Sequence, residues 1–243
     1  MTGVPRSIEA AVEQAKSATR EAIQAGLPRI VVDFNIPELK VMPVAEQFYP
    51  VLQELGLTFK LFFPDAGAAA LARRDWQDPD FSIRGINEFK GRLAPEDDAC
   101  LVVEPSAVEV NEVEALCNEA AGKYTILLSP KMEDIAVVGI GYAARQLRDR
   151  FLSTLETAYY LQPLEGATLL RVYPGPWQVW GETADDEYEL LGEFSSKPSG
   201  EAIAALFDEG AEEMSDGVPT SATRPKRGGF LAELSQFIRA LTQ

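Results

Sequence analysis

The sequence predicts an α/β protein with three layers: a mainly parallel sheet, helices on both of its faces, and an antiparallel extension near residues 158–194. Short apolar runs alternate with helical segments over the first 130 residues, which is typical of parallel sheets. From residue 158, strand-like segments follow one another with only short turns between them, and such strands pair antiparallel.

The first part of the chain supplies the first parallel strands. Ser7 can cap an opening helix that Gly26 can end, and apolar β-type runs follow, with glycine or proline at their borders. We expect, in order, a helix over 7–25, a strand over 29–34, a helix over 43–55, a strand over 59–63 and an alanine-rich helix over 66–72.

The middle and C-terminal parts continue the alternation and then change to consecutive strands. Residues 73–95 are the least regular segment. The elements expected there and beyond are a short strand near 81–86, a strand over 99–103, a helix over 111–121, a strand over 124–128, a helix over 142–156, strands over 158–162, over 168–173 continuing through 177–180, and over 188–194, and a helix over 199–207.

The pattern divides the chain into one domain and a tethered C-terminal segment. Residues 1–208 form the α/β domain, and residues 209–229 are a linker, first acidic and then basic, whose composition favours disorder. Residues 230–243 predict an amphipathic helix, which can dock on its own domain, on a partner protein or on a membrane surface. Its apolar face consists of Phe230, Leu234, Phe237, Ile238 and Leu241.

Charge and hydropathy exclude several classes of function. The net charge of −16 opposes binding to the phosphate backbone of nucleic acids, and most of this charge is concentrated in residues 182–217. No apolar run approaches the roughly 20 residues that span a bilayer. The N-terminus carries neither a secretory nor a transit signal, so we expect a cytoplasmic protein.

The chain has no histidine. The most frequent general base and metal ligand is therefore absent, and so is any Ser-His or Cys-His catalysis. Cys100 and Cys117 have no metal or redox spacing and are best explained as buried core residues of a reducing compartment. We expect no cofactor and no metal.

A glycine loop and two arginines are the main candidates for anion binding. Gly139 and Gly141 fit a G-x-G-x-x-A pattern before a helix, where backbone N–H groups can hold a phosphate. Arg145 and Arg148 share a face of that helix, and Lys131 precedes the loop. Tight backbone turns explain the glycines equally well, and structural salt bridges explain the basic residues.

Three strand ends carry polar residues that belong at the same edge of a parallel sheet. Asp65, Glu104 and Lys131 follow the strands expected over 59–63, 99–103 and 124–128. This edge is where α/β sheets bind ligands, so the three residues predict a polar crevice. Asp65 also fits the position of a helix N-cap, which is its simpler explanation.

Two tryptophans follow a turn that contains two prolines and a glycine. Trp177 and Trp180 lie on the strand after Pro174-Gly175-Pro176. One of them can be buried in the core while the other is exposed as an anchor for a partner. The sequence leaves a core role and a partner surface as alternatives.

Several motifs occur in order along the chain. They are Phe62-Phe63-Pro64-Asp65-Ala66-Gly67, Val103-Glu104-Pro105-Ser106, Val138-Gly139-Ile140-Gly141 with Arg145, Arg148 and Arg150-Phe151, Tyr159-Tyr160-Leu161-Gln162-Pro163-Leu164 and Arg171-Val172-Tyr173-Pro174-Gly175-Pro176-Trp177. With these motifs the chain resembles, over roughly residues 5–207, a domain-of-unknown-function family of cyanobacteria and chloroplasts. This family includes a plant factor needed for photosystem II accumulation and the C-terminal extension of a chloroplast adenylate kinase.

The resemblance implies a cyanobacterial protein of the cytoplasm or the thylakoid surface. Together with the missing histidine, it favours a non-enzymatic auxiliary protein that assists assembly or accumulation of a photosynthetic complex, with a photosystem subunit or assembly factor as partner. The alternative is a phosphate- or nucleotide-binding protein or enzyme that uses the loop and helix from Gly139 to Arg150. The sequence favours the non-enzymatic role without deciding between the two.

Overall fold

The computed structural model of the chain describes residues 3–88, 93–132, 142–185 and 187–213. Its strands are β1 (Arg29–Phe34), β2 (Phe59–Phe63), β3 (Ser82–Gly85), β4 (Ala99–Val103), β5 (Tyr124–Leu128), β6 (Glu156–Leu164), β7 (Ala167–Val172), β8 (Trp177–Glu182) and β9 (Tyr188–Phe194). Its α-helices are α1 (Ile8–Gln24), α2 (Val41–Phe48), α3 (Pro50–Glu54), α4 (Ala66–Asp75), α5 (Val110–Glu119), α7 (Tyr142–Arg150) and α8 (Gly200–Glu213). The predicted α/β class is confirmed.

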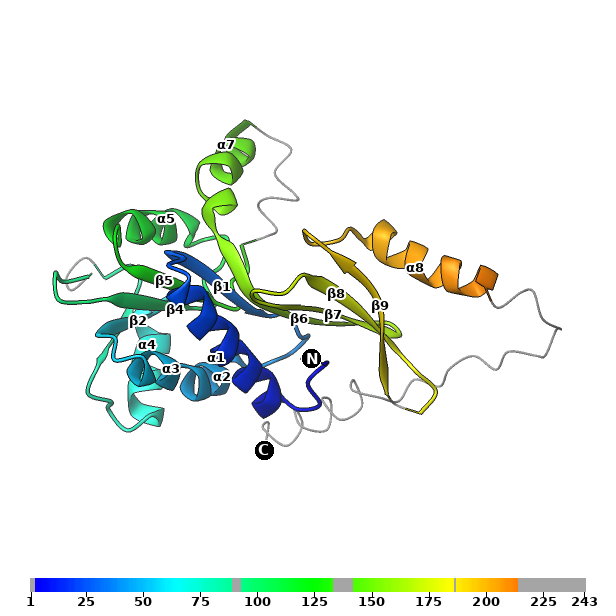
Figure 1. The fold of residues 1–243 in the computed structure, drawn as a ribbon. Coiled ribbons are helices and arrows are strands. Elements are labelled where there is room, and N and C mark those ends of the chain that lie inside the picture. Colours follow the sequence, from blue (N-terminus) through cyan, green and yellow to red (C-terminus); the bar gives the residue numbers. More distant parts are fainter. Residues whose placement is uncertain (1–2, 89–92, 133–141, 186, 214–243) are drawn as a thin grey trace.

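The described strands form one sheet in the order β3-β2-β4-β5-β1-β6-β7-β8-β9 (Figure 1). The strands from β3 to β6 are parallel, and β7, β8 and β9 continue the sheet as an antiparallel extension. Strand β1 lies near the middle and pairs in parallel with both β5 and β6. The sheet therefore has the predicted division into a parallel part and an antiparallel part.

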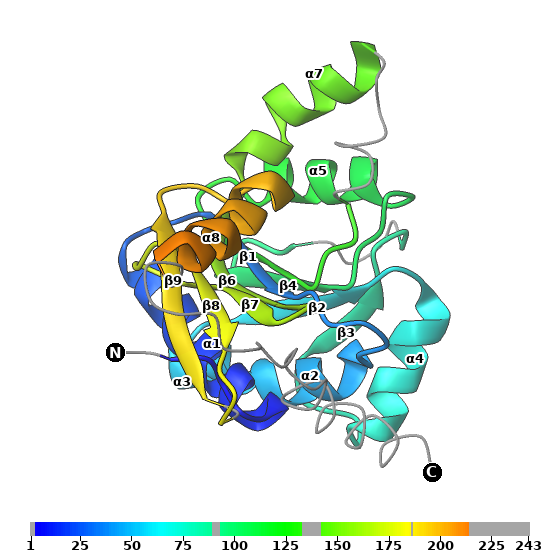
Figure 2. The same ribbon diagram turned by 90° about the vertical axis from the view of Figure 1, so that its right-hand side faces the viewer.

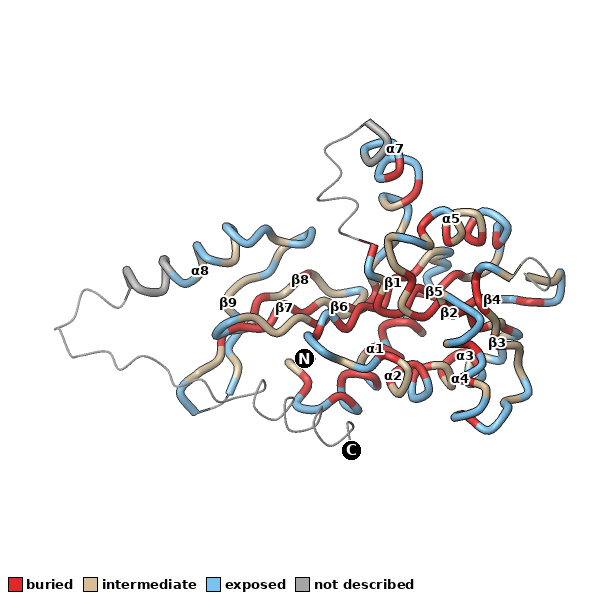
Figure 3. Tube along the Cα trace, turned by 180° about the vertical axis from the view of Figure 1, so that it is seen from behind, coloured by how far each residue is buried: buried red, intermediate tan, exposed pale blue. Residues whose placement is uncertain are grey.

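Helices cover the two faces of the sheet unequally. Helices α1 to α4 pack on one face, while α5, α7 and α8 lie on the other (Figure 2). Successive side chains of β1 point to opposite faces of the sheet and so contact both helix layers. Ile30, Val32 and Phe34 face the α1 side, and Val31 faces α5 and α7. All positions of β4 are buried, as expected for a parallel strand covered on both faces (Figure 3).

The helix expected over residues 43–55 is two helices in the structure. α2 ends at Phe48, and α3 begins at Pro50, which occupies its first turn. Proline lacks an N–H group and its ring clashes with the preceding turn, so the helix breaks before it. By contrast, Ser7 caps α1 as predicted, because its Oγ accepts a hydrogen bond from the N–H of Ala10.

Several other predicted boundaries differ from the structure, and three of them differ most. The helix expected over 142–156 ends at Arg150, because the chain from Glu156 pairs with β1 and this pairing overrides local helical preference. The strand expected to continue through 177–180 is divided by a turn at residues 173–176. The last helix extends beyond the predicted residue 207 to Glu213. The remaining linker and the predicted helix over 230–243 lie outside the described residues.

A polar cluster lies at the amino-terminal ends of the parallel strands β2, β4 and β5. The Asp97 carboxylate is only 5 % exposed and lies 3.1 Å from Lys60 Nζ on β2. It also accepts a hydrogen bond from the N–H of Ala94, and Lys123 Nζ donates to the backbone carbonyls of Ala94 and Pro95. The loop that leads into β4 is thereby fastened to β2. None of the described helices is both long enough and apolar enough to cross a membrane.

Replacing Asp97 should weaken the fold strongly. Asp97→Ala leaves the largely buried Lys60 ammonium without its carboxylate, and a buried pair broken in this way costs about 3–5 kcal/mol. We expect urea unfolding to show this loss. The matched change Glu96→Ala, at an exposed neighbour, should alter stability by less than about 0.5 kcal/mol. Equal effects at the two positions would contradict the role assigned to Asp97.

The two cysteines should make stability fall at alkaline pH. Cys100 and Cys117 are buried free thiols, as predicted, and burial raises their pKa values from 9.0 to about 12 and about 11. Because only the unfolded chain ionises readily, stability should be complete below pH 9.0 and decline as pH rises towards these folded-state values. Urea titrations across this window should show a shallower decline in the double variant Cys100→Ala/Cys117→Ala. Parallel declines would exclude the thiols as the cause.

Candidate functional site

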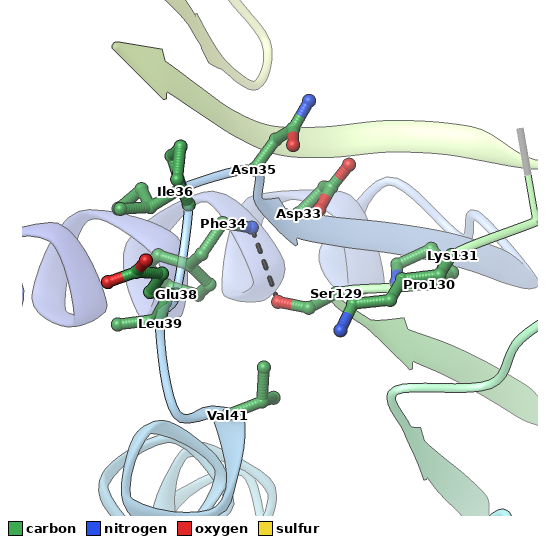
Figure 4. A pocket seen from close by; sticks show the side chains of 11 residues that line it. Asp33, Phe34, Asn35, Ile36, Glu38, Leu39, Val41, Ser129, Pro130 and Lys131 are labelled. Carbon is green, nitrogen blue, oxygen red and sulfur yellow. Dashed lines mark hydrogen bonds between the residues drawn. The ribbon is translucent and has the colours of Figure 1, made fainter.

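A pocket of about 420 Å³ lies where β1 and β5 end. Figure 4 shows Ser129 and Lys131 on one side of it and Leu39 and Val41 on the other. Its volume falls in the range of small-molecule sites. We call it the strand-end pocket. The residues that line it are Asp33, Phe34, Asn35, Ile36, Pro37, Glu38, Leu39, Val41, Ser129, Pro130 and Lys131.

The topology of the sheet explains why a pocket forms here. After β1 the chain enters α2, on the α1 face, whereas the helix described after β5, α7, lies on the opposite face. Adjacent strands whose connections diverge to opposite faces leave a crevice at their carboxyl ends, and ligands of open α/β sheets bind in such crevices. The strand-end pocket occupies this place.

The backbone is left-handed at two residues that line the strand-end pocket, Glu38 and Ser129, and at Glu104, which lines a neighbouring pocket. Glu38, Glu104 and Ser129 have φ values of 62°, 52° and 47°, a region that side chains other than glycine rarely occupy. Hydrogen bonds hold two of them: the N–H of Glu104 donates to the Leu128 carbonyl at 2.8 Å, and that of Ser129 donates to the Val32 carbonyl at 2.7 Å. Residues held in this region by their surroundings concentrate at functional sites.

Ser129 and Lys131 form the polar wall of the pocket. Ser129 is 3 % exposed, and its Oγ accepts a hydrogen bond from the N–H of Phe34 at 3.3 Å (Figure 4). The N–H of Lys131 donates to the Pro105 carbonyl at 2.8 Å, which fixes the backbone of this wall. The Lys131 ammonium forms an ion pair with Glu104, so the ends of β4 and β5 are joined by opposite charges.

A second set of polar side chains, linked by hydrogen bonds, extends from the pocket to β6. Asp33 and Asn35 line the pocket, and Asn35 Nδ2 donates to the hydroxyl of Tyr160 at 2.8 Å. The Tyr160 hydroxyl donates to Gln162 Oε1 at 2.8 Å. Lys197 Nζ lies 4.3 Å from the centroid of the Tyr160 ring. Burial raises the pKa of Tyr160, against the opposing influence of Asn35 and Lys197. The phenol therefore stays protonated and acts as a hydrogen-bonding link.

Two of the three residues predicted to form a crevice lie together in the structure, and the third lies apart from them. Glu104 and Lys131 are in contact, and both line pockets at the strand ends. Asp65 caps α4, as its simpler explanation predicts: its Oδ1 accepts from the N–H groups of Gly67 and Ala68 at 2.7 and 2.9 Å. It lines neither of the two pockets described at this edge.

The predicted phosphate loop cannot be placed, since Gly139 and Gly141 lie outside the described residues. Arg145 and Arg148 are exposed on α7 and line neither pocket. Arg150, on the same helix, forms a two-point ion pair with Glu114 of α5 at 2.7 and 2.9 Å. Phosphate or nucleotide binding by this segment stays a prediction.

Sequence reasoning missed Asp33, Asn35 and Ser129 as pocket residues. Each lies at or just beyond the end of an apolar run, in Ile30-Val31-Val32-Asp33 and Ile126-Leu127-Leu128-Ser129. This signal was present in the sequence. Its meaning depends on β1 and β5 being neighbours, which only the strand order reveals. In the described part of the chain, no three acidic or cysteine side chains gather as they would around a metal ion.

The two tryptophans of β8 have different environments. Trp177 is buried against Tyr160, with ring centroids 5.1 Å apart, on the face that α8 covers. Trp180 faces the opposite side and is only partly buried. Leu190 of β9 pairs with it across the sheet, and Tyr188 lies on the same face. We call Trp180, Tyr188 and Leu190 the extension patch.

The fold and the strand-end pocket define an open-sheet α/β protein with a crevice of the ligand-binding type. The chain matches the family described as Domain of unknown function (DUF1995) over residues 5–205, and it belongs to that family. The match begins just before α1 and includes every strand of the sheet and the start of α8. Both the pocket and the extension patch therefore lie within the family domain.

The left-handed backbone at Glu104 should be detectable by substitution. Because a β-branched side chain is strained at positive φ and glycine is not, Glu104→Val should be less stable than Glu104→Gly by about 1–2 kcal/mol in urea unfolding. The order should reverse at Gln47, an exposed position in α2, where glycine disfavours the helix. The same order at both positions would show that the backbone of Glu104 is not constrained.

Proposed function

We propose that the protein is a non-enzymatic auxiliary protein that binds a partner through the extension patch, and that this partner is a photosystem subunit or assembly factor. The observation that carries the proposal is a partly exposed apolar patch on the face of the antiparallel extension that α8 does not cover. Among the described helices, α8 covers one face of β8 and β9 (Figure 1). The patch lies on the other face.

The composition of the extension patch suits protein binding. Leu190 is 44 % exposed, while Trp180 and Tyr188 are anchored by packing against the main core. Partly exposed aromatic residues beside an aliphatic one are the typical centre of a binding surface, because they remove much apolar area from water at little entropic cost. Trp180 is the residue for which the sequence left a partner surface open.

The charges around the extension patch indicate the chemistry of the partner. Glu182 is paired with Tyr188 across the sheet, and Glu193 accepts a hydrogen bond from Gln178 at 2.7 Å. A third carboxylate, Glu187, already binds a guanidinium of this chain, that of Arg6. An acidic rim around an apolar centre favours a partner with a basic rim, and charge complementarity of this kind speeds association.

The photosynthetic part of the proposal rests on the sequence motifs. They resemble family members of cyanobacteria and chloroplasts, among them the plant factor needed for photosystem II accumulation. On this basis we propose a cytoplasmic location at the thylakoid face. Residues 230–243 have the sequence of an amphipathic helix, and they would add a second contact, with the partner or with the membrane surface.

A capture experiment tests the extension patch. The immobilised full chain is incubated with detergent-solubilised cyanobacterial thylakoids, and photosystem subunits and assembly factors are identified by immunoblot. Leu190→Glu should lower their recovery about tenfold, because a carboxylate in the centre of an apolar contact costs more than 1.4 kcal/mol. Val108→Glu introduces the same charge at an 81 % exposed aliphatic residue elsewhere and should have no effect.

Each part of the proposal can fail separately. Equal recovery by the wild type and Leu190→Glu would exclude the extension patch. Recovery of no photosynthetic component by the wild type would exclude the photosystem assignment. A chain that ends at Glu213 should retain the fold and recover less partner, and unchanged recovery would exclude residues 214–243 from the contact.

A further inference from the structure

We propose that the strand-end pocket binds a small monocarboxylate with an apolar body, and that the ligand's carboxylate takes the place of the Glu104 carboxylate beside Lys131. This site is independent of the extension patch, which lies on β8 and β9. The proposal rests on the donors at one wall of the pocket, the apolar residues opposite them, and the ion pair of Lys131 with Glu104, which lines the neighbouring pocket.

The donor wall consists of Ser129 and Lys131. The Ser129 hydroxyl accepts from Phe34, which leaves its own proton to be donated to a ligand. The Lys131 ammonium has three protons, and its pair with Glu104 uses one.

The opposite side of the pocket is apolar. Phe34, Ile36, Leu39 and Val41 contribute hydrocarbon surface to its lining, and Leu39 and Val41 continue into the neighbouring pocket of about 510 Å³ beside α2. A ligand with only an anionic head would leave this surface in contact with water. An aliphatic or aromatic body attached to the carboxylate would bury this apolar surface, and its removal from water favours binding.

Glu104, which lines the neighbouring pocket, shows that the Lys131 ammonium can hold a carboxylate. Its carboxylate lies at Lys131, and it reaches that position from a backbone with φ of 52°. Both partners of this pair are accessible, with Lys131 at 66 % side-chain exposure. An accessible ion pair contributes little to stability, so a ligand carboxylate with an apolar body can replace Glu104 at small cost.

The acidic side chains around the pocket favour a ligand with a single negative charge. Asp33 and Glu38 also line the pocket, and in Figure 4 both carboxylates point away from Ser129. They do not block the donor wall, but they repel an incoming anion in proportion to its charge. A phosphate ester with a charge near −2 is therefore disfavoured relative to a carboxylate with a charge of −1.

The test compares ligands that differ only in the head group. Isothermal titration calorimetry of the full chain is carried out with phenylacetate, phenylacetamide and phenyl phosphate, with octanoate as an aliphatic carboxylate. We expect phenylacetate or octanoate to bind at millimolar concentration, and the amide and the phosphate to bind at least about tenfold more weakly than phenylacetate. No binding by either carboxylate, or equal binding by the amide or the phosphate, would overturn the proposal.

Two variants at the ion pair give opposite expectations. Lys131→Met should weaken carboxylate binding about tenfold, since it removes a charged hydrogen bond. Glu104→Gln removes the competing carboxylate and should strengthen binding, a gain that a purely structural role of the pair would not produce. Arg20→Met, which breaks an ion pair with Glu54 on another part of the surface, is the control and should bind as the wild type does. Unchanged affinity in Lys131→Met and Glu104→Gln would refute the exchange.

Discussion

Strand β1 pairs in parallel on both edges and is covered by helices on both faces, and the places of the other elements follow from this burial. Parallel neighbours require crossover connections, so β5 and β6 can only be reached through segments that pack on the sheet. Because Val31 and Val32 face opposite layers, neither face can be left to solvent. This burial on both faces explains why the residues from Ile30 to Val32 are all apolar.

The same arrangement produces the strand-end pocket. The chain after β1 enters α2 on one face, and the helix described after β5, α7, lies on the other, so the space at these strand ends is filled by no helix described in the structure. Left-handed backbone occurs at two of the residues that line this space, Glu38 and Ser129. The pocket thus combines a topological crevice with constrained backbone at its border.

Features caused by neighbouring residues could be predicted from the sequence, whereas features that depend on contacts between distant segments could not. Apolar runs such as Phe59–Phe63 and the cap at Ser7 are recognisable from neighbouring residues, and the strand predicted over 59–63 and the start of α1 were confirmed. The break at Pro50 was also signalled locally but overlooked. The end of α7 and the pairing of Asn35 with Tyr160 depend on β6 lying beside β1, which no local pattern encodes.

The central position of β1 has a further consequence, during synthesis on the ribosome. β1 is made early, but Arg29 pairs with Thr125 and Ile30 with Glu156, so both of its neighbours emerge much later. At typical translation rates this interval is on the order of ten seconds. Throughout it, an apolar strand with two open edges is available for non-native pairing. The nascent chain is thus most vulnerable to aggregation before β6 has left the exit tunnel, and a chaperone that shields β1 during that interval would have its greatest effect on yield.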